Sequence, residues 1–181
     1  MKKDTALIII DVQNDYFEGG KSQLFKPNEA LANIEKVLAE FRKQRFTVIH
    51  VQHINEPDST FFLPDTYGAQ IHKHLTPLDN EYCLIKHMPS SFLGTNLEHV
   101  LKDSKITEVV ICGMMSHMCI DTTVRACQNY GINVILLDDA CATKDLIYND
   151  EIILAETVHK VFMSSLNGVF ASVIKTHELK I

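Results

Sequence analysis

The stretch GMMSHMCIDTTVRA, residues 113–126, places Cys119 where an apolar run passes into a helix-like pattern. A thiolate at the start of a helix is a strong nucleophile, and the helix dipole and any nearby cation stabilise it. The alternative is that Cys119 is a small buried hydrophobe, as most cysteines in folded proteins are. Which of the two applies depends on what other reactive groups the fold brings to the same place.

Two further reactive groups stand where apolar runs end. Asp11 follows TALIII, and Lys86 closes YCLIK. Ligands of open parallel sheets bind beyond the carboxyl ends of the strands, so we expect Asp11, Lys86 and Cys119 to share one edge. There the carboxylate takes the thiol proton and later activates water, while the ammonium holds both anions. Alone, Asp11 reads equally as a turn residue and Lys86 as a solvated side chain.

Strands and helices that position these groups alternate along the chain. Short apolar runs rich in β-branched residues predict strands, and periodic segments between them predict amphipathic helices. The expected strands are 5–10, 47–53, 82–86, 108–112, 133–139 and 168–174, and the expected helices are 28–45, 97–104, 118–130 and 150–166. Asn28 is the expected N-cap of the first helix, and Gly131 is expected to end the third. This alternation predicts an α/β fold with a mainly parallel sheet covered on both faces.

Residues 54–80 contain three prolines and little periodicity, which predicts a long surface excursion without regular structure. Long loops of this type often carry functional residues. The length of 181 residues suits one domain, residues 1–181. The net charge of −6, with scattered Lys and Arg, argues against nucleic acid, and no apolar run is long enough for a membrane span. Five cysteines without a C-x-x-C pair indicate reduced thiols in the cytoplasm.

Three motifs in this order resemble those of the isochorismatase-like cysteine hydrolases: LIIIDVQNDYF, IKHMPSSF and VVICGMMSHMCIDTTVRA. Their order and spacing agree over nearly the whole chain. The resemblance implies that Asp11, Lys86 and Cys119 form the family's triad. It also implies a six-stranded parallel sheet in a three-layer α/β/α sandwich, a small-molecule substrate, and assembly into dimers or larger homo-oligomers.

The same resemblance implies a non-proline cis-peptide shortly before the nucleophile, which falls at Met114–Met115. Such a bond turns the Met115 amide toward the point that the Cys119 amide faces, and two amides there form an oxyanion hole. Alternatively, these methionines fill the core. Phe17 is expected to line the pocket or the core, and His117 to contact substrate or to cap the helix start.

Nicotinamidases of the same superfamily bind a metal through an Asp-x-His pair and a further His, but this chain reads HVQHI after its second strand. His50 and His53 are three residues apart in a strand, so they point to opposite faces and do not readily share a metal. His72 and His74 share a face only if that segment is extended. We therefore expect neither a metal nor a cofactor, which also disfavours nicotinamide as the substrate.

Cys119 itself narrows the expected chemistry. Isochorismatases proper generally lack this cysteine, because a vinyl ether is opened by proton transfer to carbon. A retained cysteine favours covalent attack on a carbonyl, and GMMSHMC resembles the branch of streptothricin-hydrolase-like enzymes, which open a cyclic amide. The sequence thus predicts hydrolysis of an amide or related C–N bond. The alternatives are a vinyl-ether hydrolase, a thiol redox protein that uses Cys119 reversibly, and a binding module on an inactive enzyme.

Overall fold

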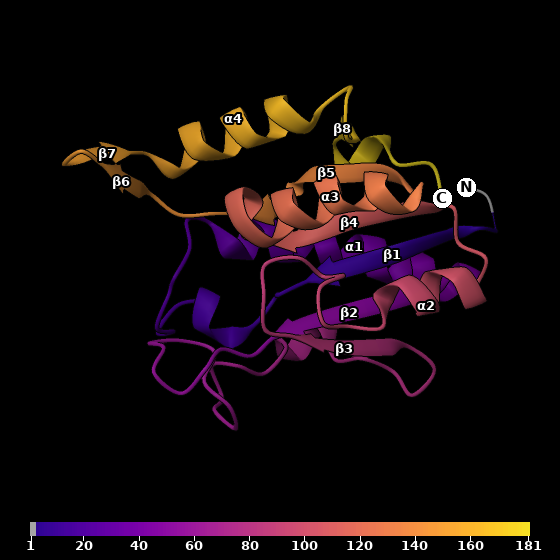
Figure 1. Ribbon diagram of the computed structural model, residues 1–181, viewed down its shortest axis with the longest axis horizontal. Helices are drawn as coiled ribbons and strands as arrows, with labels where there is room; N and C mark the ends of the chain where they lie inside the picture. The colour runs from indigo at the N-terminus through magenta and orange to yellow at the C-terminus, as the bar shows by residue number, and fades with distance from the viewer. Residues whose placement is uncertain (1–2) are drawn as a thin grey trace.

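The structure, a computed structural model that describes residues 3–181, has a six-stranded parallel sheet between two layers of helices (Figure 1). The strand order is β3-β2-β1-β4-β5-β8. The strands are β1 (Thr5–Ile10), β2 (Thr47–His53), β3 (Tyr82–Lys86), β4 (Glu108–Met114), β5 (Asn133–Ala142) and β8 (Ser172–Ile174). The chain builds outward from β1 to β3 and then returns to add β4 on the other side of β1. The order therefore reverses between β1 and β4.

Alternating side chains of the strands build one core on each face of the sheet. From β1, Leu7 and Ile9 pack on the side of α1 (Pro27–Gln44), while Ala6, Ile8 and Ile10 pack on the other side. That second core is covered by α2 (Leu97–Asp103), α3 (Asp121–Cys127) and α4 (Ala155–Leu166). Figure 1 shows α2 and α3 in front of the sheet and α1 behind it. The predicted three-layer sandwich is confirmed.

The segment before α3 departs from regular helix geometry. Residues Ser116–Ile120 form a single π-helical turn, α3 follows, and a 3-10 turn, Gln128–Tyr130, closes the element. Gly131 ends it at φ +67°, as the sequence predicted, because glycine adopts the left-handed conformation without strain. Cys119 therefore lies within a π-turn, a feature that is frequent at functional sites.

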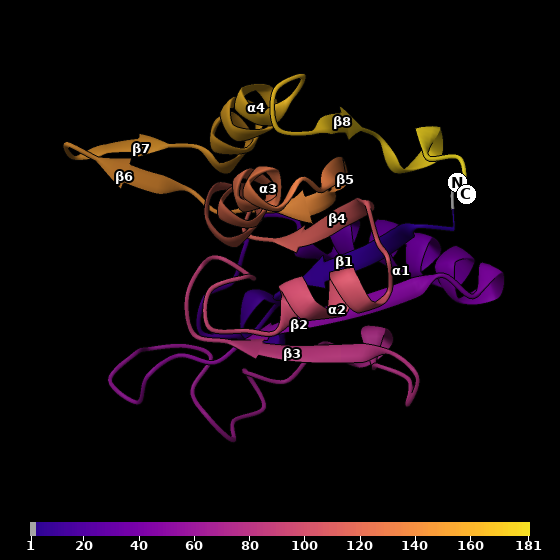
Figure 2. The same cartoon turned by 45° about the vertical axis from the view of Figure 1, so that its right-hand side comes forward.

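Two sequence predictions about the helices are wrong. The last helix begins at Ala155 and not at residue 150, because β6 (Leu146–Tyr148) and β7 (Glu151–Ile153) form an antiparallel hairpin. Its two-residue turn has positive φ at both positions, the type that suits the twist of a hairpin. The N-cap of α1 is Lys26, not Asn28, because Pro27 takes the first helical position. Figure 2 shows the hairpin projecting beyond the body of the molecule.

The excursion over residues 54–80 has one 3-10 turn, Lys73–Leu75, and otherwise no helix or strand. It is nevertheless packed, because Phe62, Ala69 and Leu75 are buried in the core on the α1 side. Gln13 anchors the excursion through its side chain. Its Nε2 donates hydrogen bonds of 2.8 Å to the carbonyl of His53 and of 2.7 Å to the carbonyl of Ala69. Among residues 3–181, no helix has the length and apolar character needed to cross a bilayer.

Candidate active site

The strand order reverses between β1 and β4, and in open parallel sheets ligands bind beyond the carboxyl ends of the strands at such a reversal. Asp11 comes directly after β1 and has the left-handed backbone conformation, with φ at +53°. The cis peptide bond Met114–Met115 lies at the end of β4, and Cys119 follows in the π-turn. The left-handed conformation of Asp11 is uncommon for a residue other than glycine, and such residues cluster at functional sites. The fold thus places an acid and a thiol at its topological switch point.

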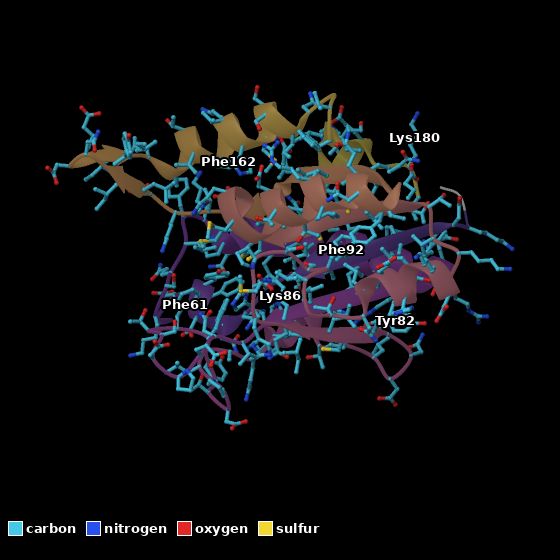
Figure 3. The ribbon with its side chains drawn as sticks, in the orientation of Figure 1. Phe61, Tyr82, Lys86, Phe92, Phe162 and Lys180 are labelled. Atoms are coloured by element: carbon cyan, nitrogen blue, oxygen red, sulfur yellow. The ribbon has the colours of Figure 1, made fainter. Side chains whose placement is uncertain are left out.

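Lys86 comes from β3, the edge strand, and its side chain reaches over β2 to join the other two groups. Its Nζ lies 2.8 Å from Asp11 Oδ2 and donates a hydrogen bond of 3.2 Å to Cys119 Sγ. It also lies 2.8 Å from His53 Nδ1 and donates to the carbonyl of Met88 at 3.1 Å. The structure therefore brings together all three predicted catalytic side chains, with the Lys86 ammonium in contact with the other two. Figure 3 shows Lys86 near the middle of the molecule.

The three groups are almost fully removed from water. Asp11 and Lys86 have no exposed surface, and Cys119 is 6% exposed. Burial raises the pKa of the Cys119 thiol well above its usual value; the charge of Asp11 raises it further, and Lys86 opposes both. The expected effect of a nearby cation is present, since Lys86 lowers the pKa of the thiol, but burial and Asp11 act against it.

His53 is a site residue that sequence reasoning missed. The prediction that His50 and His53 point to opposite faces of β2 holds, since His50 bonds Glu81 at 2.9 Å while His53 bonds Lys86. The histidine spacing bears only on a shared metal, whereas His53 contacts the Lys86 ammonium. A usable signal was present: His53 and Lys86 each end a predicted parallel strand.

The oxygen, nitrogen and sulfur atoms of Asp11, His53 and Cys119 lie within 4.8 Å of one another, a spacing that suits a bound cation. In this structure the cation among them is the Lys86 ammonium, which contacts each of the three groups. The position is thus already taken by a side chain of the protein. His50 belongs to a different cluster, with Glu81 and Arg42.

The three remaining predicted site residues lie around this centre. Met115 forms the start of the π-turn, and its carbonyl accepts from the amides of Met118 and Ile120. Phe17 is 7% exposed, and its ring lies 4.4 Å from that of His72. His117 is half-buried and hydrogen-bonds the Thr143 hydroxyl, so its ring is held against the end of β5. Roles for these three in substrate binding stay predictions.

A parallel sheet covered on both faces, with a carboxylate, an ammonium and a thiol buried where its strands end, is the architecture of an α/β enzyme. Comparison with known proteins makes this specific. The isochorismatase domain model matches residues 5–178, so the chain belongs to the isochorismatase family and is a hydrolase of that family.

Relatives match along the whole chain. The uncharacterised isochorismatase family protein YddQ of Bacillus subtilis is 48% identical over 173 residues, which cover 95% of this chain and 96% of the relative. The crystal structure of an isochorismatase from Pseudomonas putida is 35% identical with a TM-score of 0.93, covering 98% of this chain and 91% of that one. Streptothricin hydrolase of Streptomyces noursei is 30% identical over 141 residues, 78% of this chain but only 50% of that enzyme.

Proposed function

We propose that this protein is a cysteine hydrolase that cleaves an amide or related C–N bond of a small molecule through an acyl-enzyme on Cys119. One observation carries the proposal: a single buried ammonium, that of Lys86, contacts both the Asp11 carboxylate and the Cys119 sulfur. A buried thiol of raised pKa needs a base that acts as it attacks. Asp11 is the carboxylate within reach.

In the first half-reaction, Cys119 Sγ attacks the carbonyl carbon while its proton passes to Asp11. We expect the amides of Met115 and Cys119, which follow the end of β4, to hold the developing oxyanion. The C–N bond then breaks, and Asp11 returns the proton to the leaving amine. Lys86 stabilises the sulfur as it becomes anionic and keeps the carboxylate beside it.

In the second half-reaction, water attacks the thioester carbon and gives a proton to Asp11. The C–S bond then breaks, Asp11 returns the proton to the Cys119 sulfur, and the acid product leaves. No metal or cofactor takes part in either half. Phe17 and His117 border the substrate in this scheme. Support for a C–N bond comes from the retained Cys119 and from the similarity to streptothricin hydrolase. All five cysteines are free, and we place the enzyme in the cytoplasm as a homo-oligomer.

The test is intact-mass spectrometry after incubation with a panel of small amides, lactams and ureido compounds, with product analysis alongside. Wild type is compared with Cys119→Ala and Asp11→Asn. We expect an acyl adduct and released amine with wild type, no adduct with Cys119→Ala, and no turnover with Asp11→Asn although iodoacetamide still labels its Cys119.

Other outcomes separate the alternatives. Turnover that survives in Cys119→Ala contradicts the covalent route and points to acid–base opening of a vinyl ether. A wild-type cysteine that cycles reversibly with peroxide and keeps this behaviour in Asp11→Asn points to a redox role, because such chemistry needs neither Asp11 nor Lys86.

A further inference from the structure

His53 lies between the strand that carries Lys86 and the strand that carries Asp11. It ends β2, and its Cα is the register partner of Lys86 across the parallel pair β2–β3. Register partners project their side chains to the same face of a sheet. The Lys86 side chain therefore passes beside the imidazole on its way to Asp11, and Nζ lies 2.8 Å from His53 Nδ1.

The other nitrogen of the ring is held by the excursion. His53 Nε2 lies 2.8 Å from Asn55 Oδ1, and Asn55 Nδ2 donates to the Phe61 carbonyl at 2.9 Å. The backbone N–H of Asn55 also donates to the Phe62 carbonyl at 3.0 Å. Lys86 donates to Nδ1, so the ring's own hydrogen lies on Nε2 and is donated to Asn55. Figure 3 shows Phe61 toward the left edge of the molecule and Lys86 near its middle.

A neutral ring is required for this arrangement, since a protonated imidazole has no acceptor. Burial lowers the pKa of His53 and the Lys86 charge lowers it further, while Asp11 and Asn55 act in the opposite direction. The titratable groups around the ring are Asp11, Lys86, His87 and Cys119. Two of these, Lys86 and His87, disfavour a second positive charge on the imidazole.

We propose that His53 is a positioning residue: its Nδ1 accepts from Lys86 and so fixes the ammonium between Asp11 and Cys119, while Asn55 fixes the ring. This rests on the proposed function, in which Lys86 serves the thiol. A lysine side chain is a flexible four-carbon stem with a strongly hydrated charge. At a position with no exposed surface, each of the three N–H groups of the ammonium needs an acceptor. Cys119 Sγ, the Met88 carbonyl and His53 Nδ1 lie at hydrogen-bonding distance, and of these three only His53 is a side chain that does not itself react.

The test measures the rate at which iodoacetamide alkylates Cys119 as a function of pH, which requires no substrate. A Cys83→Ser background removes the exposed thiol, and peptide mass spectrometry reports Cys119 alone. Four variants are compared: His53→Leu removes the acceptor, His53→Asn restores one near the Nδ1 position, Asn55→Ala frees the ring, and His50→Leu is the matched control. His50 lies on the same strand but faces Glu81 on the opposite side.

We expect His53→Leu to slow alkylation about tenfold at each pH, the size of one hydrogen bond to a charged group. Asn55→Ala should give a smaller decrease, His53→Asn should recover most of the rate, and His50→Leu should match wild type even if it lowers stability. Equal rates in wild type, His53→Leu and Asn55→Ala overturn the proposal. If His53→Leu does not fold, the alkylation rates of Asn55→Ala and His53→Asn are compared with that of wild type. A rate in Asn55→Ala equal to that of wild type then overturns the proposal. Absence of an acyl-enzyme with every substrate overturns the proposed function and leaves this measurement intact.

Discussion

Replacing Lys86 by methionine removes the ammonium while keeping a side chain of similar length. The change leaves the Asp11 carboxylate without its cation at a position with no exposed surface. Exposed ion pairs contribute less than about 1 kcal/mol, but removing one partner of a buried pair costs about 3–5 kcal/mol, because a buried charge is left uncompensated. With a urea dependence of about 2 kcal/mol per molar, the unfolding midpoint should fall by about 2 M.

Equilibrium urea unfolding, followed by circular dichroism, measures this loss. The double variant Asp11→Asn, Lys86→Met removes both charges and should be more stable than Lys86→Met alone, with a coupling of at least about 1 kcal/mol. Lys43→Met is the control: Lys43 pairs with Glu40 at 2.9 Å, but its side chain is 70% exposed. A Lys86→Met protein as stable as this control would refute the reasoning.

Three further predictions concern acid stability, the thiol and assembly. Burial tends to raise the pKa of Glu81, but hydrogen bonds from Arg42, the Leu78 amide and His50 outweigh it and lower the pKa to about 2. The ionised Glu81 contributes about 2 kcal/mol to the free energy of unfolding. This contribution is present above the usual pKa of the group and is lost as pH falls toward 2, so the melting temperature of Glu81→Gln should depend less on pH in that range than that of wild type. Burial raises the pKa of the Cys119 thiol, so its alkylation should keep accelerating into alkaline solution, whereas a plateau at or below neutral pH would show a preformed thiolate. Ile147 and Ile152 on the β6–β7 hairpin are 77% and 67% exposed, so changing both to Asp should reduce the sedimentation coefficient if, as we expect, the hairpin lies in a homo-oligomer interface; an unchanged coefficient in a wild-type oligomer would place the interface elsewhere.

The sequence predicted the sheet and its reactive ends because both depend on local pattern. Continuous apolar runs mark buried parallel strands, and strands of one parallel sheet end at a common edge. Asp11, Lys86 and Cys119 were therefore expected at one place before any strand order was known. The order itself was not predictable, since the apolar pattern of a buried parallel strand does not identify its neighbours. For this reason Lys86 could be predicted to lie at the carboxyl end of the sheet. That its strand lies two positions away from the strand of Asp11 could not be predicted.

Other features escaped because they depend on contacts rather than on pattern. The segment 146–153 forms two short strands whose apolar residues are exposed. It therefore lacks the alternation of apolar and polar residues from which a half-buried strand is predicted. The raised pKa of Cys119 follows from burial under distant segments, which a motif does not reveal. His53 was considered only as a metal ligand, because histidine is a common one, and that role was judged unfavourable. Its contact with Lys86 follows only from the β2–β3 register.

The position of Lys86 on β3 has a consequence for how the protein behaves on warming. β3 is an edge strand that, among residues 3–181, pairs with β2 alone, and Tyr82, Cys83 and Ile85 are exposed along it. Edge segments open at a lower free energy than the centre of a sheet, so amide hydrogens in β3 should exchange through sub-global opening while β1 and β4 stay protected. Such an opening withdraws the ammonium and leaves the acid and the thiol in a folded body. Activity then depends on the local stability of one peripheral strand, and it should fade at temperatures where most of the domain is still native.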